Sequence, residues 1–100
     1  MTLIYITCKD KEEAKKISKD LLEKRLIACS NMFPIDSMYW WKGRIEEAAE
    51  VVILAKTKEK NYKKIKEEVT KIHSYEIPCI LKIESEANES YQKWIEEEVK

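Results

Sequence analysis

One short polar segment, residues 73–78, brings together side chains that can bind a ligand. His73 offers an imidazole nitrogen, Tyr75 a phenol and Glu76 a carboxylate. Histidine is the commonest transition-metal ligand, and a nearby carboxylate can add an oxygen, so this segment is a candidate metal site. The alternative is that His73 simply ends a helix, where its charged form would interact favourably with the helix dipole.

A second group of candidates lies in the middle of the chain. Tyr39, Trp40 and Trp41 can stack on a ligand or a base, although aromatic residues alternating on a strand more often anchor a core or an interface. Lys56 follows a long apolar run, where it either faces a cleft and holds an anion or is the first solvated residue. Stacking on nucleic acid is not expected, because the aromatic residues lack a basic surround.

Composition limits the classes of protein that fit. The chain has 100 residues with 19 basic and 19 acidic side chains, which predicts one small domain, residues 1–100, of zero net charge. A dedicated nucleic-acid binder would carry a net basic face, and a disordered chain would lack the periodic hydrophobic runs seen here. Most of the charged residues are Lys and Glu. This composition is typical of hyperthermophile proteins, but an ordinary soluble protein with solvated helix faces would show it as well.

The sequence shows no arrangement typical of an enzyme. It has a single histidine and no GxSxG, P-loop or GxGxxG motif, so we do not predict catalysis. Cys8, Cys29 and Cys79 are odd in number and show no CxxC spacing, which favours reduced thiols in the cytoplasm over disulfides or a zinc site. We see no signal peptide and no apolar run of transmembrane length, so no membrane association is expected.

The elements that must position these residues centre on a long hairpin. Gly43 is the only glycine, and it lies between two strand-like stretches, Leu26–Trp41 and Arg44–Thr57. Glycine accepts positive φ, so Lys42-Gly43 is predicted to be the hairpin tip. An arm of this length cannot cover its own apolar surface, and we expect another copy of the chain to cover it.

Periodicity and capping signals predict the remaining elements. In chain order they are a strand at Leu3–Cys8, a helix opened by a capping box of Asp10 and Glu13, a helix at Lys58–His73, a strand at Cys79–Glu84 and a last helix capped by Asn88. The order βαββαβ plus a C-terminal helix predicts an α+β fold, a ferredoxin-like sandwich with an antiparallel sheet. Its helices would cover one sheet face, and the open face predicts an oligomer.

Several segments together resemble the CutA family of divalent-cation tolerance proteins. They are Ala28-Cys29-Ser30-Asn31, Tyr39-Trp40-Trp41-Lys42-Gly43-Arg44-Ile45-Glu46, Lys56-Thr57 and His73-Ser74-Tyr75-Glu76-Ile77-Pro78, with Tyr91 and Trp94-Ile95 closing the pattern. The resemblance covers nearly the whole chain. It implies a ferredoxin-like fold assembled as a tight homotrimer, hairpins that reach neighbouring subunits, a cytoplasmic location, and binding or tolerance of divalent metals, copper above all.

The chain departs from the family at the copper ligands. Those proposed for the family include a Cys in the first strand and a pair of His before the conserved Tyr. Here Ile6 and Ile72 stand at the positions of that Cys and of the first His, so only His73 carries over. Cys8 lies on the same strand face as Ile6 and can substitute for the missing Cys. The resemblance therefore implies a metal site of His73 with Glu76 or Cys8.

Three functions are predicted from these observations. The first is a non-enzymatic trimer that binds divalent metal. The second is a small-molecule sensor, because the assembly is similar to that of the PII signalling proteins, which bind ligands in clefts between subunits. Such a cleft would be lined by Tyr39, Trp41, Lys56, Tyr75 and Glu76, with Lys56 holding an anionic group. The third is a stable structural trimer without any ligand.

Overall fold

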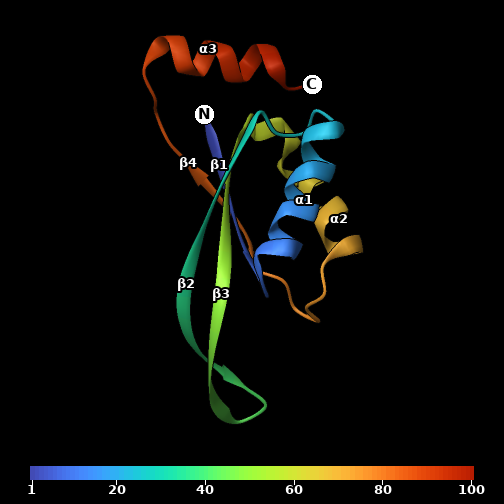
Figure 1. The fold of residues 1–100 in the computed structure, drawn as a ribbon. Helices are drawn as coiled ribbons and strands as arrows, with labels where there is room; N and C mark the ends of the chain where they lie inside the picture. Colours follow the sequence, from blue (N-terminus) through green and yellow to red (C-terminus); the bar gives the residue numbers. More distant parts are fainter.

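The computed structural model describes residues 1–100 and has the predicted order of elements. These are β1 (Thr2–Cys8), α1 (Lys11–Glu23), β2 (Cys29–Trp41), β3 (Arg44–Thr57), a 3₁₀ turn (Glu59–Asn61), α2 (Tyr62–Ile72), β4 (Ile80–Glu84) and α3 (Glu89–Glu98). Figure 1 shows the ferredoxin-like sandwich, with α1 and α2 on one face of the sheet and α3 at the end where the N-terminus lies. None of the helices combines the length and the apolar character that crossing a membrane requires.

The sheet is antiparallel with the strand order β2-β3-β1-β4. β1 and β3 are therefore the two central strands. Side chains alternate between the faces of a strand, so Ile4, Ile6 and Cys8 of β1 all point toward the helices and are fully buried. They pack in one cluster with Ile17 and Leu21 of α1, and this cluster is the core of the domain.

Two predicted starts were wrong. The second helix begins at Tyr62, after a 3₁₀ turn, and not at Lys58. The second strand begins at Cys29 and not at Leu26. Arg25 has φ of 57°, and the Leu26 N–H donates back to the Leu21 carbonyl oxygen at 3.0 Å, so the chain is still closing α1 at this point. Leu26 and Ile27 are nevertheless buried in the core. Their apolar character reflects core packing and not strand pairing.

The predicted hairpin is present and extends beyond the rest of the sheet. β2 and β3 pair in one unbroken register from Cys29 opposite Lys56 to Trp41 opposite Arg44. The turn residues Lys42 and Gly43 both have positive φ, 50° and 79°, as a two-residue hairpin turn requires. β1 pairs with β3 only as far as Val51, so the outer part of the hairpin is a two-stranded arm (Figure 1).

The arm carries three of the four most exposed large apolar side chains. Met38 is 70% exposed, Trp40 72% and Ile45 59%. A two-stranded ribbon is marginal in water without further packing. The arm therefore presents a surface that another molecule can cover.

Candidate functional site

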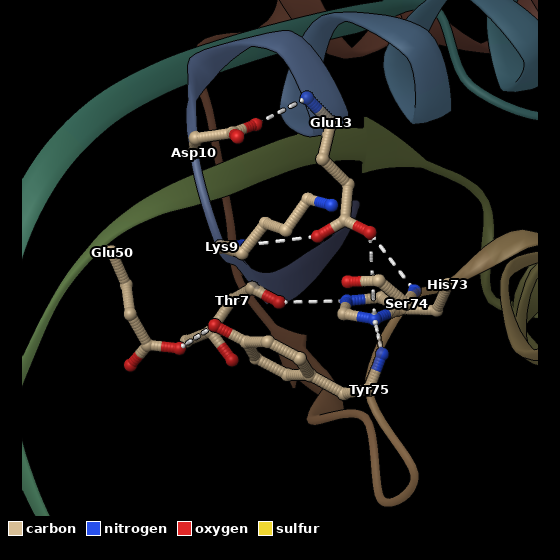
Figure 2. Close-up of polar contacts among 8 residues, drawn as sticks. All are labelled: Thr7, Lys9, Asp10, Glu13, Glu50, His73, Ser74 and Tyr75. Atoms are coloured by element: carbon tan, nitrogen blue, oxygen red, sulfur yellow. Dashed lines mark hydrogen bonds and ion pairs between the residues drawn. The ribbon is translucent and has the colours of Figure 1, made fainter.

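His73 lies where α2, β1 and α1 meet. It is the first residue after α2, and its side chain is completely buried. The Tyr75 N–H donates to His73 Nδ1 at 3.0 Å, so the ring proton is on Nε2, which donates to the Thr7 carbonyl oxygen at 2.8 Å (Figure 2). Both ring nitrogens are therefore used in fixing the segment after α2 to the end of β1.

Glu13 connects the same region to the start of α1. Its N–H donates to Asp10 Oδ1 at 2.8 Å, which confirms Asp10 as the N-cap. The return bond of the predicted capping box is shifted by one residue, because Glu13 Oε1 accepts from the N–H of Lys9 at 3.0 Å and not from that of Asp10. Glu13 Oε2 accepts from the Ser74 N–H at 2.9 Å and lies 4.0 Å from His73 Nδ1. Burial opposes the charge on Glu13, but hydrogen bonding by Ser74 and Lys9 outweighs it and lowers the pKa of this carboxyl.

Cys8 completes a set of three potential metal ligands. The donor atoms of Cys8, Glu13 and His73 all lie within 4.8 Å of one another. The structure thus brings together two of the residues predicted for a metal site, His73 and Cys8, with Glu13 in place of Glu76. Burial, followed by the charges of nearby carboxylates, raises the pKa of Cys8 to about 12, so its sulfur keeps its proton at neutral pH.

Glu76 instead lines an open groove of about 1010 Å³ between the hairpin arm and residues 74–77. The groove is also lined by three aromatic residues that were predicted for a ligand cleft, namely Tyr39, Trp41 and Tyr75. Trp40 also lines the groove, as does Tyr5 from the open face of β1. The structure therefore places four of the five predicted cleft residues around one hollow.

Lys56, the fifth residue, lies elsewhere. It pairs with Cys29 on β2 and with Leu3 on β1, near the end of β3 that is remote from the hairpin tip. Its Nζ is 3.9 Å from Cys29 Sγ. Within one chain, the groove has no contribution from this cation.

Glu50 is a groove residue that the sequence reasoning missed. It is only 7% exposed, and its Oε2 accepts a hydrogen bond from the Tyr75 hydroxyl at 2.5 Å (Figure 2). Burial and then the proximity of Glu50 raise the pKa of Tyr75. A signal for Glu50 was present, because it lies two positions before Val52 and therefore on the same strand face as a residue of the apolar run.

Known proteins resemble this chain over its full length. Residues 2–98 match the family model of the CutA1 divalent ion tolerance protein. The divalent-cation tolerance protein CutA of Thermotoga maritima is 46% identical, over 99% of both chains. A structure described as the periplasmic divalent cation tolerance protein CutA from Archaeoglobus fulgidus has a TM-score of 0.96 at 44% identity, over 100% of both chains.

A third similar protein of known structure is described as PII-like. The structure of a protein described as PII-like protein CutA, from Nostoc sp. PCC 7120, has a TM-score of 0.92 at 26% identity, covering 100% of this chain and 98% of that one. The predicted resemblance is confirmed by these matches. The chain belongs to the CutA1 divalent ion tolerance protein family.

Proposed function

We propose that this protein is a non-enzymatic homotrimer that binds divalent metal ions, copper above all, and so contributes to their tolerance. The observation that carries the proposal is the convergence of a sulfur, a nitrogen and an oxygen donor, from Cys8, His73 and Glu13, within 4.8 Å. Thiolate and imidazole are ligands that suit copper and zinc, and a carboxylate can complete the set. The name of the family agrees with this chemistry.

The cluster would bind metal at a cost. A metal ion must take one ring nitrogen of His73 from its partner, either the Thr7 carbonyl or the Tyr75 N–H. It must also displace the proton of the Cys8 thiol, whose pKa is raised to about 12. We therefore expect weak binding that strengthens with pH, with Cu²⁺ bound more tightly than Zn²⁺.

Calorimetric titration with Cu²⁺ and with Zn²⁺ tests this assignment. We expect His73→Ala and Cys8→Ala to lose binding, whereas Glu76→Gln, which alters an exposed carboxylate outside the cluster, should bind as the wild type does. Circular dichroism of each variant shows that it is folded. Equal, weak binding by wild type and by both cluster variants would contradict the proposed site.

The trimer is proposed from the surfaces that one chain leaves open. The arm exposes Met38, Trp40 and Ile45, and β4 exposes Leu81 and Ile83. Apolar side chains in such numbers on one small domain mark an interface. A neighbouring copy of the same chain would cover them by a closed, symmetric arrangement.

A second candidate function is small-molecule sensing, favoured by the groove beside the arm. Its volume of about 1010 Å³ and its aromatic lining suit a small ligand. The description of the Nostoc relative as PII-like points the same way. A thermal-shift screen of metabolites and nucleotides tests it, since a ligand of the folded state raises the melting temperature. If no compound stabilises the protein and no metal binds, a purely structural trimer is the remaining function.

We further propose a cytoplasmic location. It is supported by three free cysteines, Cys8, Cys29 and Cys79, which are typical of a reducing compartment. The Archaeoglobus structure is described as periplasmic, so relatives do not settle the point. Fractionation of source cells followed by immunodetection would decide between the two compartments.

A further inference from the structure

The backbone of residues 74 and 75 is held by atoms that the metal cluster would use as ligands. The Tyr75 N–H donates to Nδ1 of His73 at 3.0 Å, and the Ser74 N–H donates to Oε2 of Glu13 at 2.9 Å (Figure 2). These two acceptor atoms lie 4.0 Å apart. A nitrogen and an oxygen of the cluster therefore already serve as hydrogen-bond acceptors for this segment.

The tautomer of His73 decides which of its nitrogens is available to a metal ion. Nε2 lies 2.8 Å from the carbonyl oxygen of Thr7, which can only accept, so Nε2 carries the ring proton. The opposite tautomer would turn a lone pair toward that oxygen and a second N–H toward the Tyr75 N–H. A neutral imidazole binds metal through its unprotonated nitrogen. That nitrogen is Nδ1, so coordination requires that Nδ1 releases the Tyr75 N–H.

Tyr75 connects this nitrogen to the groove between the hairpin arm and residues 74–77. Its ring centroid lies 4.9 Å from that of His73, and its hydroxyl donates to Oε2 of Glu50 at 2.5 Å. Tyr75, Ser74 and Glu50 all line the groove. The N–H of one residue is thus held at the cluster and its hydroxyl at the groove. A displacement of this backbone must move a side chain that forms part of the groove wall.

We propose that metal binding at the Cys8–Glu13–His73 cluster releases the backbone of residues 74–75 and weakens the hydrogen bond between Tyr75 and Glu50, so that the groove changes shape with the metal state. This inference rests on the metal-binding function proposed above, and it names the structural response to the metal. It also links the two candidate functions. A ligand that prefers one shape of the groove must change the affinity for metal by the same factor by which metal changes its own affinity.

Heteronuclear NMR of the isotope-labelled full chain during titration with Zn²⁺ tests the proposal. Zn²⁺ is the probe because it has no unpaired electrons to broaden the signals. His73 is the only histidine, so its two ring nitrogens are assigned without ambiguity. We expect Nδ1 to show the large change of chemical shift that coordination produces, and the amide of Tyr75 to shift with it. Among the five tyrosine amides, the Tyr75 signal is identified by its loss from tyrosine-labelled Tyr75→Phe.

The affinity for Zn²⁺ measures the coupling itself. Tyr75→Phe keeps the N–H and the ring but removes the hydroxyl that Glu50 holds in the metal-free arrangement. We therefore expect this variant to bind Zn²⁺ about fivefold more tightly than the wild type, as coupling between linked sites commonly gives. Tyr39→Phe is the matched control, because it removes a hydroxyl from the same groove that is not bonded to Glu50, and its affinity should equal that of the wild type.

The outcomes separate this inference from the function on which it rests. Zinc binding that leaves the Tyr75 amide unshifted, or that occurs at Nε2, would overturn the inference and leave a metal site in place. Equal zinc affinity in the wild type and in both tyrosine variants would do the same. No change at either nitrogen of His73 in a large excess of Zn²⁺ would overturn both. If Tyr75→Phe proves unfolded by circular dichroism, Glu50→Gln, which removes the charge from the acceptor of the same hydrogen bond, carries the affinity test.

Discussion

The hydroxyl of Tyr75 donates to a carboxylate oxygen of Glu50 across 2.5 Å, and this contact ties the segment after α2 to the base of the hairpin arm. Each residue belongs to a different wall of the groove between the hairpin arm and residues 74–77. The N–H of Tyr75 meanwhile holds the imidazole of His73. One residue therefore joins the groove to the Cys8–Glu13–His73 cluster, so the two proposed sites are neighbours that share a support.

Removing this hydroxyl should destabilise the protein. Tyr75→Phe leaves the buried carboxylate of Glu50 without its donor, and hydrogen bonds to charged groups contribute about 1.5–3 kcal/mol to the free energy of unfolding. Urea denaturation followed by circular dichroism would measure the loss. Tyr39→Phe is the matched control, because it removes a hydroxyl from the same groove that makes no hydrogen bond within the chain, and a change of similar size there would contradict the assignment.

The ion pair between Lys24 and Glu68, which joins the end of α1 to α2, should make stability depend on acid pH. The hydrogen bond from Lys24 lowers the pKa of Glu68 below its ordinary value of 4.5 in the folded state. The unfolded chain therefore takes up the proton first, so this contribution is complete above about pH 4.5 and is lost as pH falls through the lower folded pKa.

Melting temperatures measured from pH 7 to pH 2 would show the effect. Glu68→Gln should be less stable than wild type at pH 7 and should lose stability less steeply on acidification. Glu67→Gln changes an exposed neighbour that forms no ion pair, and its curve should run parallel to that of wild type. Parallel curves for all three proteins would mean that the pair has no energetic role.

Cys8 should be the least reactive of the three cysteines. It is fully buried and its pKa is raised to about 12, whereas Cys29 and Cys79 are only partly buried. Alkylation requires the thiolate, so iodoacetamide at pH 8 should label Cys8 last in the native protein. Peptide mass spectrometry would follow the three rates, with guanidinium-unfolded protein as the control in which they converge. Native labelling of Cys8 at the unfolded rate would contradict its burial.

Trp40 should be needed for assembly. It is 72% exposed on an arm that has no other strand beside it, so a neighbouring copy is proposed to cover it. Light scattering at micromolar concentration should give three times the 11.9 kDa of one chain for wild type and a lower mass for Trp40→Ser. Arg44→Ser, an exposed polar change at the same tip, is expected to remain a trimer. A monomeric wild type would overturn the proposed architecture.

The sequence was sufficient to predict the fold because its signals were local and consistent. A single glycine placed the hairpin tip, and Asp10 with Glu13 placed the start of α1, as the structure confirms. The start of β2 was misplaced because buried apolar residues such as Leu26 occur in closing turns as well as in strands. Periodicity reports burial, and it does not distinguish the backbone conformation that achieves it.

The candidate site was harder to predict, since it depends on which distant residues meet. Glu13 was interpreted only as a capping residue of α1. Nothing in the neighbouring sequence shows that its second carboxylate oxygen accepts a hydrogen bond from Ser74, which follows the C-terminal end of α2. The distance between Lys56 and the groove within one chain could have been predicted. With a two-residue turn, the register puts Lys56 opposite Cys29, ten positions from Tyr39 along β2, or about 33 Å at a strand's rise per residue.

The position of β1 in the middle of the sheet also constrains how the chain is made. β1 leaves the ribosome before the other strands of its sheet, but its two partners are β3, which ends at Thr57, and β4, which ends at Glu84. Its backbone groups can find their sheet partners only after most of the chain has been synthesised. Such distant pairing slows folding. The nascent chain must therefore carry the apolar residues of β1 unpaired, and a chaperone that binds extended apolar segments would recognise it during this interval.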